Sequence, residues 1–394
     1  MALRNQRILI SGAGIGGPAL AFWLRRHGFE PTLIERAPAF RDGGYMIDVW
    51  GVGYDLVERM GLLPAALEAG YFIEHVRFVD EYGKRRSGFD GDLFRLALNG
   101  RFFSIPRGDL ARLIFRKVDA ETRFSTSVEA LREDADCVEV HFNHGPPERF
   151  DLVIGADGLR SHVRECVFGP EKSYEKYLGY YAASFITQGY PHRDEKTYLS
   201  FSKPGRSIAR YALRGGRSAF LFVFAKDRRI PSHETSLHKA ILHQTFGQDG
   251  WETPEILARM DETDELYFDA VSQIRMPQWS KGRVALVGDA AHCPSLMAGA
   301  GSAFAMLGAY ILAGELHKAD GDHTKAFAAY ERRMRPFIDK QQRDAERFAP
   351  SFAPRTAFGL FVRDTVLNLM KVRPLAIWFT RRNFANAFDL PDYS

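Results

Sequence analysis

Three glycines near the N-terminus, followed by an acidic residue, have the spacing of a phosphate-binding turn. Gly12, Gly14 and Gly17 form the pattern G-x-G-x-x-G, and Glu35 follows downstream. The first glycine permits a tight turn, the second lets a pyrophosphate approach the backbone, and the third lets a helix and a strand pack closely. A carboxylate at Glu35 can accept hydrogen bonds from a ribose. These residues predict the binding of a dinucleotide.

Two strands and a helix must surround these residues if they are to act together. The apolar run at 8–10 predicts a buried parallel strand. The apolar spacing after Gly17-Pro18 predicts a helix that ends at His27-Gly28. A second strand at 32–34 would place Glu35 at its carboxyl end. Because a helix N-terminus offers free N–H groups to phosphates, the stretch predicts a βαβ nucleotide-binding unit.

Two later stretches place an acid and glycines directly after predicted strands. A strand at 150–154 leads into Gly-Ala-Asp-Gly, where Asp157 is either a turn or cap residue or part of the nucleotide site. A strand at 284–287 leads into Gly288-Asp289, and a helix that extends to about residue 317 follows soon after. The strands of one doubly wound sheet would therefore come from distant parts of the chain.

The composition is that of an ordinary globular protein with two domains or one elaborated domain. The chain has 394 residues and a net charge of +4, with 45% hydrophobic and 26% charged residues. Its basic clusters are short, so we expect no nucleic-acid partner. Cys137, Cys166 and Cys293 lie far apart without C-x-x-C spacing, so neither a metal site nor a disulfide framework is expected. These features predict a reducing, cytoplasmic location.

Two segments resemble export or membrane signals. Arg4 and Arg7 precede a long uncharged run, as in a signal peptide, but glycines interrupt this run and it continues directly into Glu35. Residues 290–314 contain no Lys, Arg, Asp or Glu, which is long enough to span a bilayer. Pro294 and several glycines suit a loop that leads into a helix better. We therefore expect a dinucleotide site in the first segment and no membrane span in the second.

The middle of the chain predicts a sheet and the end predicts helices. Alternating runs with glycine-rich turns over 174–275 indicate antiparallel strands, and 73–80 and 94–98 also read as strands. Phe222 and Phe224 would share one strand face, either as core or as the wall of a ligand site. From about residue 349 the chain reads as amphipathic helices packed on the body, with membrane-surface binding as the alternative.

Three segments together resemble the class A FAD-dependent aromatic monooxygenases. They are the glycine turn with Glu35, the stretch ADGLRSHVR and the stretch GRVALVGDAAH. This family includes para-hydroxybenzoate hydroxylase, and the spacing of Arg41 and Asp48 is similar to its tetracycline-modifying branch. The resemblance implies an α/β fold: a Rossmann-like FAD-binding domain (1–72, 101–173 and 279–345), an inserted antiparallel-sheet substrate domain (73–100 and 174–278) and a C-terminal helical segment (346–394).

The resemblance also implies a set of cofactor contacts. The glycines would receive the pyrophosphate, Glu35 the adenosine ribose and Asp289 the ribityl chain. Arg107 would reach the flavin, and the helix N-terminus at 299–302 would stabilise negative charge at the flavin pyrimidine edge. The full predicted FAD set is Gly12, Ala13, Gly14, Ile15, Gly16, Gly17, Glu35, Arg36, Asp48, Arg107, Val128, Asp157, Gly288, Asp289, Gly299, Ala300, Gly301 and Ser302. Arg41 is either an NADPH contact or a solvated loop residue, and His292 is expected to be structural.

The implied activity is hydroxylation of an aromatic or polyketide-like small molecule through a flavin C4a-hydroperoxide, with FAD as cofactor and NADPH or NADH as reductant. No catalytic side chain or metal is required. The alternatives are an FAD-dependent reductase of isoprenoid-type double bonds and a non-catalytic flavin-binding protein. The family commonly has Pro where Leu296 stands and Asn where Ser302 stands, which affects the expected oxygen pocket. The substrate-wall candidates are Arg210, Phe222, Phe224, Leu296 and Met297, and the assembly is a monomer or homodimer.

Overall fold

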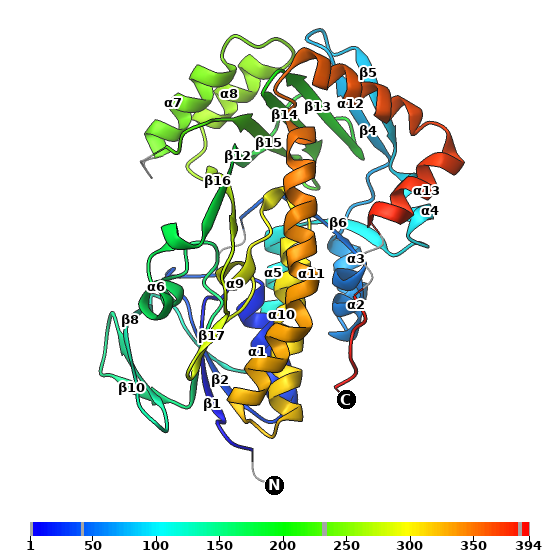
Figure 1. Cartoon of the computed structure of the whole chain (residues 1–394). Helices are drawn as coiled ribbons and strands as arrows, with labels where there is room; N and C mark the ends of the chain where they lie inside the picture. Colours follow the sequence, from blue (N-terminus) through cyan, green and yellow to red (C-terminus); the bar gives the residue numbers. More distant parts are fainter. Residues whose placement is uncertain (1–2, 41–42, 231–234, 385–387, 394) are drawn as a thin grey trace.

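A six-stranded sheet with helices on both sides forms the lower half of the molecule (Figure 1). The computed structural model describes residues 3–40, 43–230, 235–384 and 388–393. In spatial order the strands are β17 (Ser280–Lys281), β18 (Val284–Leu286), β11 (Leu152–Gly155), β1 (Arg7–Ser11), β2 (Glu30–Ile34) and β7 (Glu121–Arg123). All neighbouring strands are parallel except β17 and β18. The central parallel strands β1, β11 and β18 are apolar and buried. Helix α1 (Gly16–Arg26) packs on β1 and β2, α6 (His162–Phe168) on β11 and β18, and strand β10 (Glu148–Phe150) of a second small sheet also contacts β1.

The predicted βαβ unit is present. Helix α1 (Gly16–Arg26) connects β1 to β2 and packs against α10 (Gly301–Lys318), which in turn packs against the long helix α11 (His323–Phe352). Smaller elements complete this half: β3 (Met46–Trp50) paired with β6 (Phe102–Pro106), the sheet β8 (Val128–Glu133), β9 (Val138–Phe142) and β10 (Glu148–Phe150), the helices α2 (Val52–Arg59), α3 (Leu63–Ala69), α5 (Arg107–Phe115), α6 (His162–Phe168) and α9 (Asp289–His292), and the short helices η1 (Glu171–Ser173) and η2 (Leu296–Ala298).

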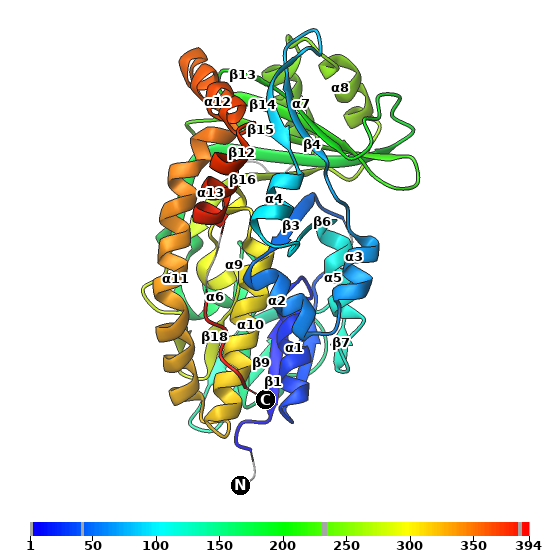
Figure 2. The same ribbon diagram turned by 90° about the vertical axis from the view of Figure 1, so that its right-hand side faces the viewer.

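A seven-stranded sheet forms the upper half. Its order is β16 (Tyr267–Ile274), β12 (Glu175–Gln188), β15 (Arg217–Ala225), β14 (Arg206–Ala212), β13 (Thr197–Lys203), β4 (His75–Val79) and β5 (Arg85–Asp90). Neighbours are antiparallel except β13 and β4. Helices α7 (Thr235–Phe246) and α8 (Thr253–Asp261) cover the outer face, and α11 runs alongside both halves (Figure 2). Helices α12 (Ala357–Leu369) and α13 (Arg373–Phe384) follow, with α12 lying against β5.

The α/β fold class is confirmed, and three details differ from the expectation. Residues 94–98 do not form a strand, because α4 (Asp92–Ala97) buries Leu93 and Ala97 one helical turn apart. The helices α7 and α8 lie inside the stretch that we read as sheet. Helix α11 is continuous across residues 345 and 346, between which we placed the boundary of the C-terminal segment.

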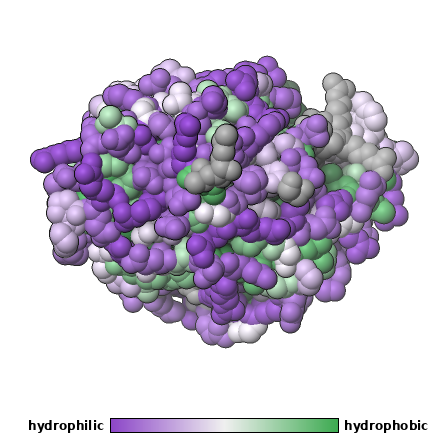
Figure 3. Space-filling view, turned by 90° about the horizontal axis from the view of Figure 1, so that it is seen from below, coloured by the Kyte–Doolittle hydropathy of each residue, from purple (hydrophilic) through white to green (hydrophobic). Residues whose placement is uncertain are grey.

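The uncharged stretch 290–314 is a loop that leads into a helix. It contains the end of α9, the short helix η2 and most of α10, with Ser295 and Gly299 in left-handed backbone conformations between them. Within the described ranges, no helix has both the length and the apolar character needed to cross a bilayer. Seen from below, the surface is largely hydrophilic with smaller apolar areas (Figure 3).

Candidate active site

A large cleft extends from the carboxyl ends of the parallel strands to the inner face of the antiparallel sheet. Its volume is about 3340 Å³, well above the ~300–1,000 Å³ of a site for one drug-sized ligand. Residues directly after β1, β2, β11 and β18 line one end, and residues of β12, β13 and β15 line the other. Such strand ends are where open α/β sheets bind ligands. The cleft therefore has room for a dinucleotide and a second molecule.

The three motif glycines occupy different environments. Gly12 has a φ of +108°, and a Cβ there would lie 2.5 Å from the Ala156 carbonyl oxygen. A Cβ on Gly17 would lie 1.9 Å from the Gly12 carbonyl oxygen, so Gly17 permits close packing of α1 on the turn and does not line the cleft. A Cβ on Gly14 would meet no protein atom within 4 Å, and Gly14 lines the cleft. Open space at Gly14 is what a phosphate approaching the backbone requires.

Glu35 connects the glycine turn to the end of β2. Its Oε2 accepts a hydrogen bond from the Ala13 N–H at 2.9 Å, and its Oε1 accepts one from the Ala37 N–H at 3.0 Å. Glu35, Arg36 and Val128 all line the cleft beside the turn. Because a carboxylate has about four lone-pair sites, Glu35 can also accept hydrogen bonds from a ligand hydroxyl.

Asp157 caps a helix and also lines the cleft. Its Oδ2 accepts hydrogen bonds from the N–H groups of His162 (2.9 Å) and Val163 (3.1 Å), which caps the start of α6. Its Oδ1 is buried and has no hydrogen-bond partner among the described residues, although Asp157 lines the cleft. Burial raises the pKa of this carboxyl. Since an unpaired buried oxygen is costly, Oδ1 fits a site for a donor on a bound ligand.

Asp289 and the start of α10 form the middle of the cleft. Burial raises the pKa of Asp289, while a hydrogen bond with Cys293 and the positive charge of Arg107 oppose this increase. A Cβ on Gly301 would lie 3.8 Å from Asp289 Oδ1. The N-cap residue of α10, Ala300, offers no side-chain hydrogen bond to the first turn. The first N–H groups of this 18-residue helix can therefore stabilise negative charge on a ligand in the cleft.

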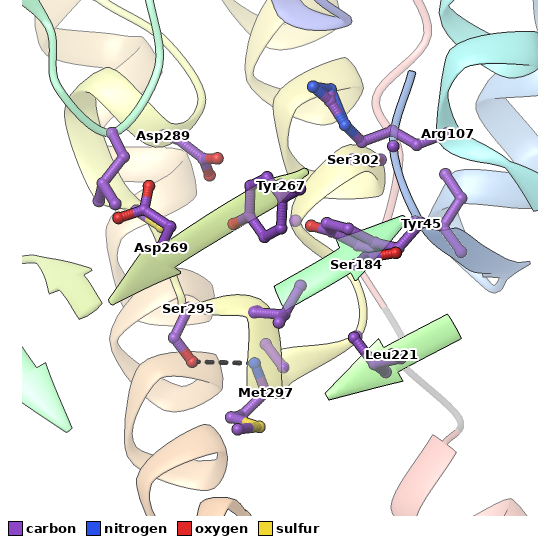
Figure 4. A pocket seen from close by; sticks show the side chains of 18 of the residues that line it. Tyr45, Arg107, Ser184, Leu221, Tyr267, Asp269, Asp289, Ser295, Met297 and Ser302 are labelled. Carbon is purple, nitrogen blue, oxygen red and sulfur yellow. Dashed lines mark hydrogen bonds between the residues drawn. The ribbon is translucent and has the colours of Figure 1, made fainter. Parts of the chain in front are cut away.

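The wall opposite Asp289 contains several residues that sequence reasoning missed. Tyr45 and Tyr267 lie with their ring centroids 5.6 Å apart, near Arg107 (Figure 4). Ser184 and Leu221 enter the same pocket from β12 and β15 (Figure 4). These residues carry no motif, and only the register of the strands could have identified them.

Two of the predicted substrate residues line the cleft. Leu296 and Met297 lie on η2, and Met297 donates its backbone N–H to Ser295 Oγ at 3.2 Å (Figure 4). Asp48 also lines the cleft and accepts a hydrogen bond from Ser104 at 2.5 Å. Loss of solvation raises the pKa of Asp48, and the bond from Ser104 opposes this increase.

The other three predicted wall residues do not line the cleft, so that prediction is wrong for them. Phe222 and Phe224 are fully buried on the outer face of the sheet, with centroids 5.1 and 5.9 Å from that of Phe246 in α7. Arg210 is 3% exposed and donates to Glu252 (2.6 and 2.8 Å) and Asp194 (2.7 Å). The core alternative that we left open therefore describes Phe222 and Phe224.

The remaining predicted residues divide as follows. Most of the predicted FAD set lines the cleft: Gly12, Ala13, Gly14, Ile15, Gly16, Glu35, Arg36, Asp48, Arg107, Val128, Asp157, Gly288, Asp289, Gly299, Gly301 and Ser302. Gly17 and Ala300 lie behind this surface. Arg41 lies outside the described residues. His292 is 1% exposed and lies 3.4 Å from the Tyr330 hydroxyl, and burial lowers its pKa to about 3, so it is a neutral core residue.

Comparisons with known proteins agree with this geometry. The model of the family described as "FAD binding domain" matches residues 5–344. A flavin-dependent monooxygenase of Legionella longbeachae serogroup 1 (strain NSW150) is 36% identical over 401 aligned residues, which cover 99% of each chain. The crystal structures of the tetracycline destructases Tet(51) and Tet(55) are 33% and 31% identical, with TM-scores of 0.82 and 0.84, and cover 100% of each chain.

Proposed function

The chain belongs to the FAD-binding family of flavin-dependent monooxygenases, and we propose that it hydroxylates an aromatic or polyketide-like small molecule with NADPH or NADH as the reductant. The observation that carries the substrate proposal is the continuity of the cleft. One end has the glycine turn and the other has the inner face of the antiparallel sheet, with Asp289 and the start of α10 between them. A flavin held in the middle would therefore face a second ligand directly.

The residues of the cleft can hold FAD by backbone groups and three acids. We assign the pyrophosphate to the turn around Gly14, the ribose to Glu35 and the ribityl hydroxyls to Asp289. We assign Asp157 Oδ1, buried without a partner in the described chain, to a hydroxyl donor of the dinucleotide near the glycine turn. When bound, FAD supplies hydride acceptance and activation of O₂, so the protein needs no nucleophile of its own.

The chain's own contribution to the reaction is electrostatic and steric. The first turn of α10 and the Arg107 guanidinium place positive potential where a reduced flavin would carry negative charge. Met297 and Leu221 present apolar side chains to the same pocket and exclude water from it. Tet(51) and Tet(55) are named as tetracycline destructases, which supports a polycyclic substrate for this chain.

The source of electrons and the location belong to the same proposal. The chain contains one G-x-G-x-x-G motif, so we infer that NADPH or NADH visits the cleft transiently after FAD is bound. Cys137, Cys166 and Cys293 are free thiols, which supports a reducing cytoplasm where both nucleotides are abundant.

The test is a turnover assay with isotope labelling. The purified holoenzyme is mixed with NADPH or NADH under ¹⁸O₂, with and without a polycyclic phenol such as 2-naphthol. We expect the phenol to accelerate nucleotide oxidation and the product to contain ¹⁸O. In a parallel assay with an isoprenoid alkene in place of the phenol, reduction of the alkene without oxygen uptake would instead support an isoprenoid reductase. Failure of both nucleotides to reduce the flavin would support a non-catalytic flavin protein.

A further inference from the structure

An arginine from the C-terminal helix α12 lines the cleft at the antiparallel sheet. The Arg363 side chain is 12% exposed, and its guanidinium lies 4.4 Å from the centroid of the Phe78 ring. Nη1 donates to Ser202 Oγ at 3.0 Å, and Nη2 donates to Asp364 Oδ1 at 3.2 Å. Nε is buried and has no hydrogen-bond partner in the described part of the chain. One N–H donor of a buried cation at the cleft therefore has no acceptor in the described chain.

A row of buried hydroxyls extends from this guanidinium across the floor of the cleft. Ser202 Oγ donates to Ser207 Oγ at 3.2 Å, and Ser207 Oγ lies 3.1 Å from Ser200 Oγ. Ser200 and Ser207 line the cleft. Beyond them, apolar side chains such as Phe89 form the wall. A polar strip within an apolar chamber is the arrangement that orients a mainly apolar ligand by one polar group.

The charges around Arg363 do not balance. Asp364 is shared with a second cation, since its Oδ2 lies 3.5 Å from Arg86 Nε, and its Oδ1 also accepts a hydrogen bond from Ser87. Two guanidiniums thus share one carboxylate. Arg86 is 49% exposed, so water solvates its charge, whereas Arg363 is largely buried. Tyr198, beside Arg363, stays neutral because burial raises its pKa. The uncompensated positive charge therefore lies at the cleft.

The burial of Arg363 makes its uncompensated positive charge unfavourable. Burial lowers the pKa of Arg363, and Asp364 only partly opposes it. A guanidinium nevertheless remains charged in proteins. A partner that accepts hydrogen bonds from it would offset the unfavourable free energy of burying this charge. Planar oxygen anions are the ligands that arginine binds best, because its N–H donors match their geometry.

We propose that Arg363, with Ser200 and Ser207, forms a subsite for an anionic oxygen group, such as a carboxylate, on the aromatic substrate. This inference rests on the proposed function, and it makes the substrate an aromatic acid rather than a neutral arene. The competing explanation is that Arg363 only anchors α12 to the sheet. Anchoring would affect all ligands equally, whereas an anion subsite discriminates by charge.

The experiment compares a matched acid and amide. 6-Hydroxy-2-naphthoic acid and 6-hydroxy-2-naphthamide are titrated into the FAD-loaded enzyme without NADPH or NADH, and their dissociation constants are measured by calorimetry. We expect the wild type to prefer the acid. In Arg363→Gln the acid should bind about 10- to 100-fold more weakly, as expected for a lost charged hydrogen bond, while the amide changes by less than about threefold.

Two further variants control for folding and anchoring. Asn368→Ala removes a hydrogen bond that anchors α12 to the Arg86 backbone carbonyl of β5 and leaves the charges around Arg363 unchanged. Asn368 does not line the cleft, so the acid-to-amide ratio should stay at the wild-type value. Arg363→Lys keeps the charge without the planar donor set and should lose part of the acid affinity and none of the amide affinity. If Arg363→Gln fails to retain FAD, Arg363→Lys provides the comparison.

Three outcomes would overturn the subsite. The first is a wild type that does not prefer the acid, including one that binds neither compound. The second is an equal loss of acid and amide affinity in the Arg363 variants, and the third is the same loss of selectivity in Asn368→Ala. Because binding is measured without reductant, an enzyme that fails to hydroxylate would contradict the proposed function without changing these ratios.

Discussion

At the scale of single residues, Gly14 and Gly17 show how one motif combines a ligand task with a packing task. The protein leaves open space where a Gly14 Cβ would project, whereas a Gly17 Cβ would overlap the Gly12 carbonyl oxygen. The two glycines are alike in sequence. Their surroundings assign the first to the cofactor and the second to the fold.

This difference gives a paired prediction. Gly14→Ala should fold with nearly wild-type stability and bind FAD more weakly, because the new methyl group enters the space that we assign to the pyrophosphate. Gly17→Ala should destabilise the protein by at least about 1–3 kcal/mol, the usual cost of overpacking. Denaturant unfolding of the apoproteins and FAD titration separate the two effects. Equal losses of stability in both variants would contradict the assignment.

The residues at the strand ends were predictable because their spacing alone places them. Glu35, Asp157 and Asp289 each follow a short apolar run, so their position at one sheet edge follows from parallel pairing. Tyr45 and Tyr267 were not predictable. They lie side by side because the residue before β3 and the first residue of β16, which belong to different halves of the molecule, come together at the cleft.

At the scale of elements, strand β15 shows how alternation defines two faces without identifying which one is functional. Phe222 and Phe224 were correctly placed on one face, but that face is covered by α7. Leu221 and Val223 point the other way and line the cleft. Successive side chains of a strand point to opposite faces of the sheet. A prediction that selects the wrong face therefore names the buried core residues in place of the residues that line the cleft.

Truncation of a side chain on the covered face should therefore mainly lower the unfolding free energy, whereas truncation on the cleft face should mainly change the substrate KM. Phe222→Ala should cost about 3–5 kcal/mol of unfolding free energy, because it empties a packed core position, and leave KM unchanged. Leu221→Ala should cost less stability and alter the substrate KM. Denaturant unfolding together with steady-state kinetics would test this pair. A change of KM in Phe222→Ala at unchanged flavin content would contradict the register described here.

Three helices were missed for physical reasons. The segment of α4 has only six residues, four of them apolar, and short segments of this kind fit a strand and a buried helix equally well. Helices α7 and α8 sit between strongly alternating segments, and their function is to cover the aromatic outer face of the sheet. The requirement for helices that cover this face becomes evident only when the face is known to be apolar.

At the scale of the whole molecule, three distant segments meet in one cleft because β1, β11 and β18 are neighbours in the sheet. Local periodicity predicted each strand. It could not predict the order of the strands in the sheet, because that order depends on pairing between segments that are far apart in the sequence. The resemblance of the combined motifs to a known family supplied that order. The position of Arg363 on the floor of the cleft is also a long-range result, since α12 reaches the sheet only after the long passage of α11.

The most direct test of the account is the affinity of the apoprotein for FAD in the wild type and in Asp289→Ala, followed by flavin fluorescence. The account predicts one FAD per chain in the wild type and weaker binding in the variant by ~1.5–3 kcal/mol, the value of a hydrogen bond to a charged group. The exposed control Asp119→Ala should bind FAD as the wild type does. A wild type that takes up no flavin, or undiminished affinity in Asp289→Ala, would contradict the convergence of these segments on one cofactor.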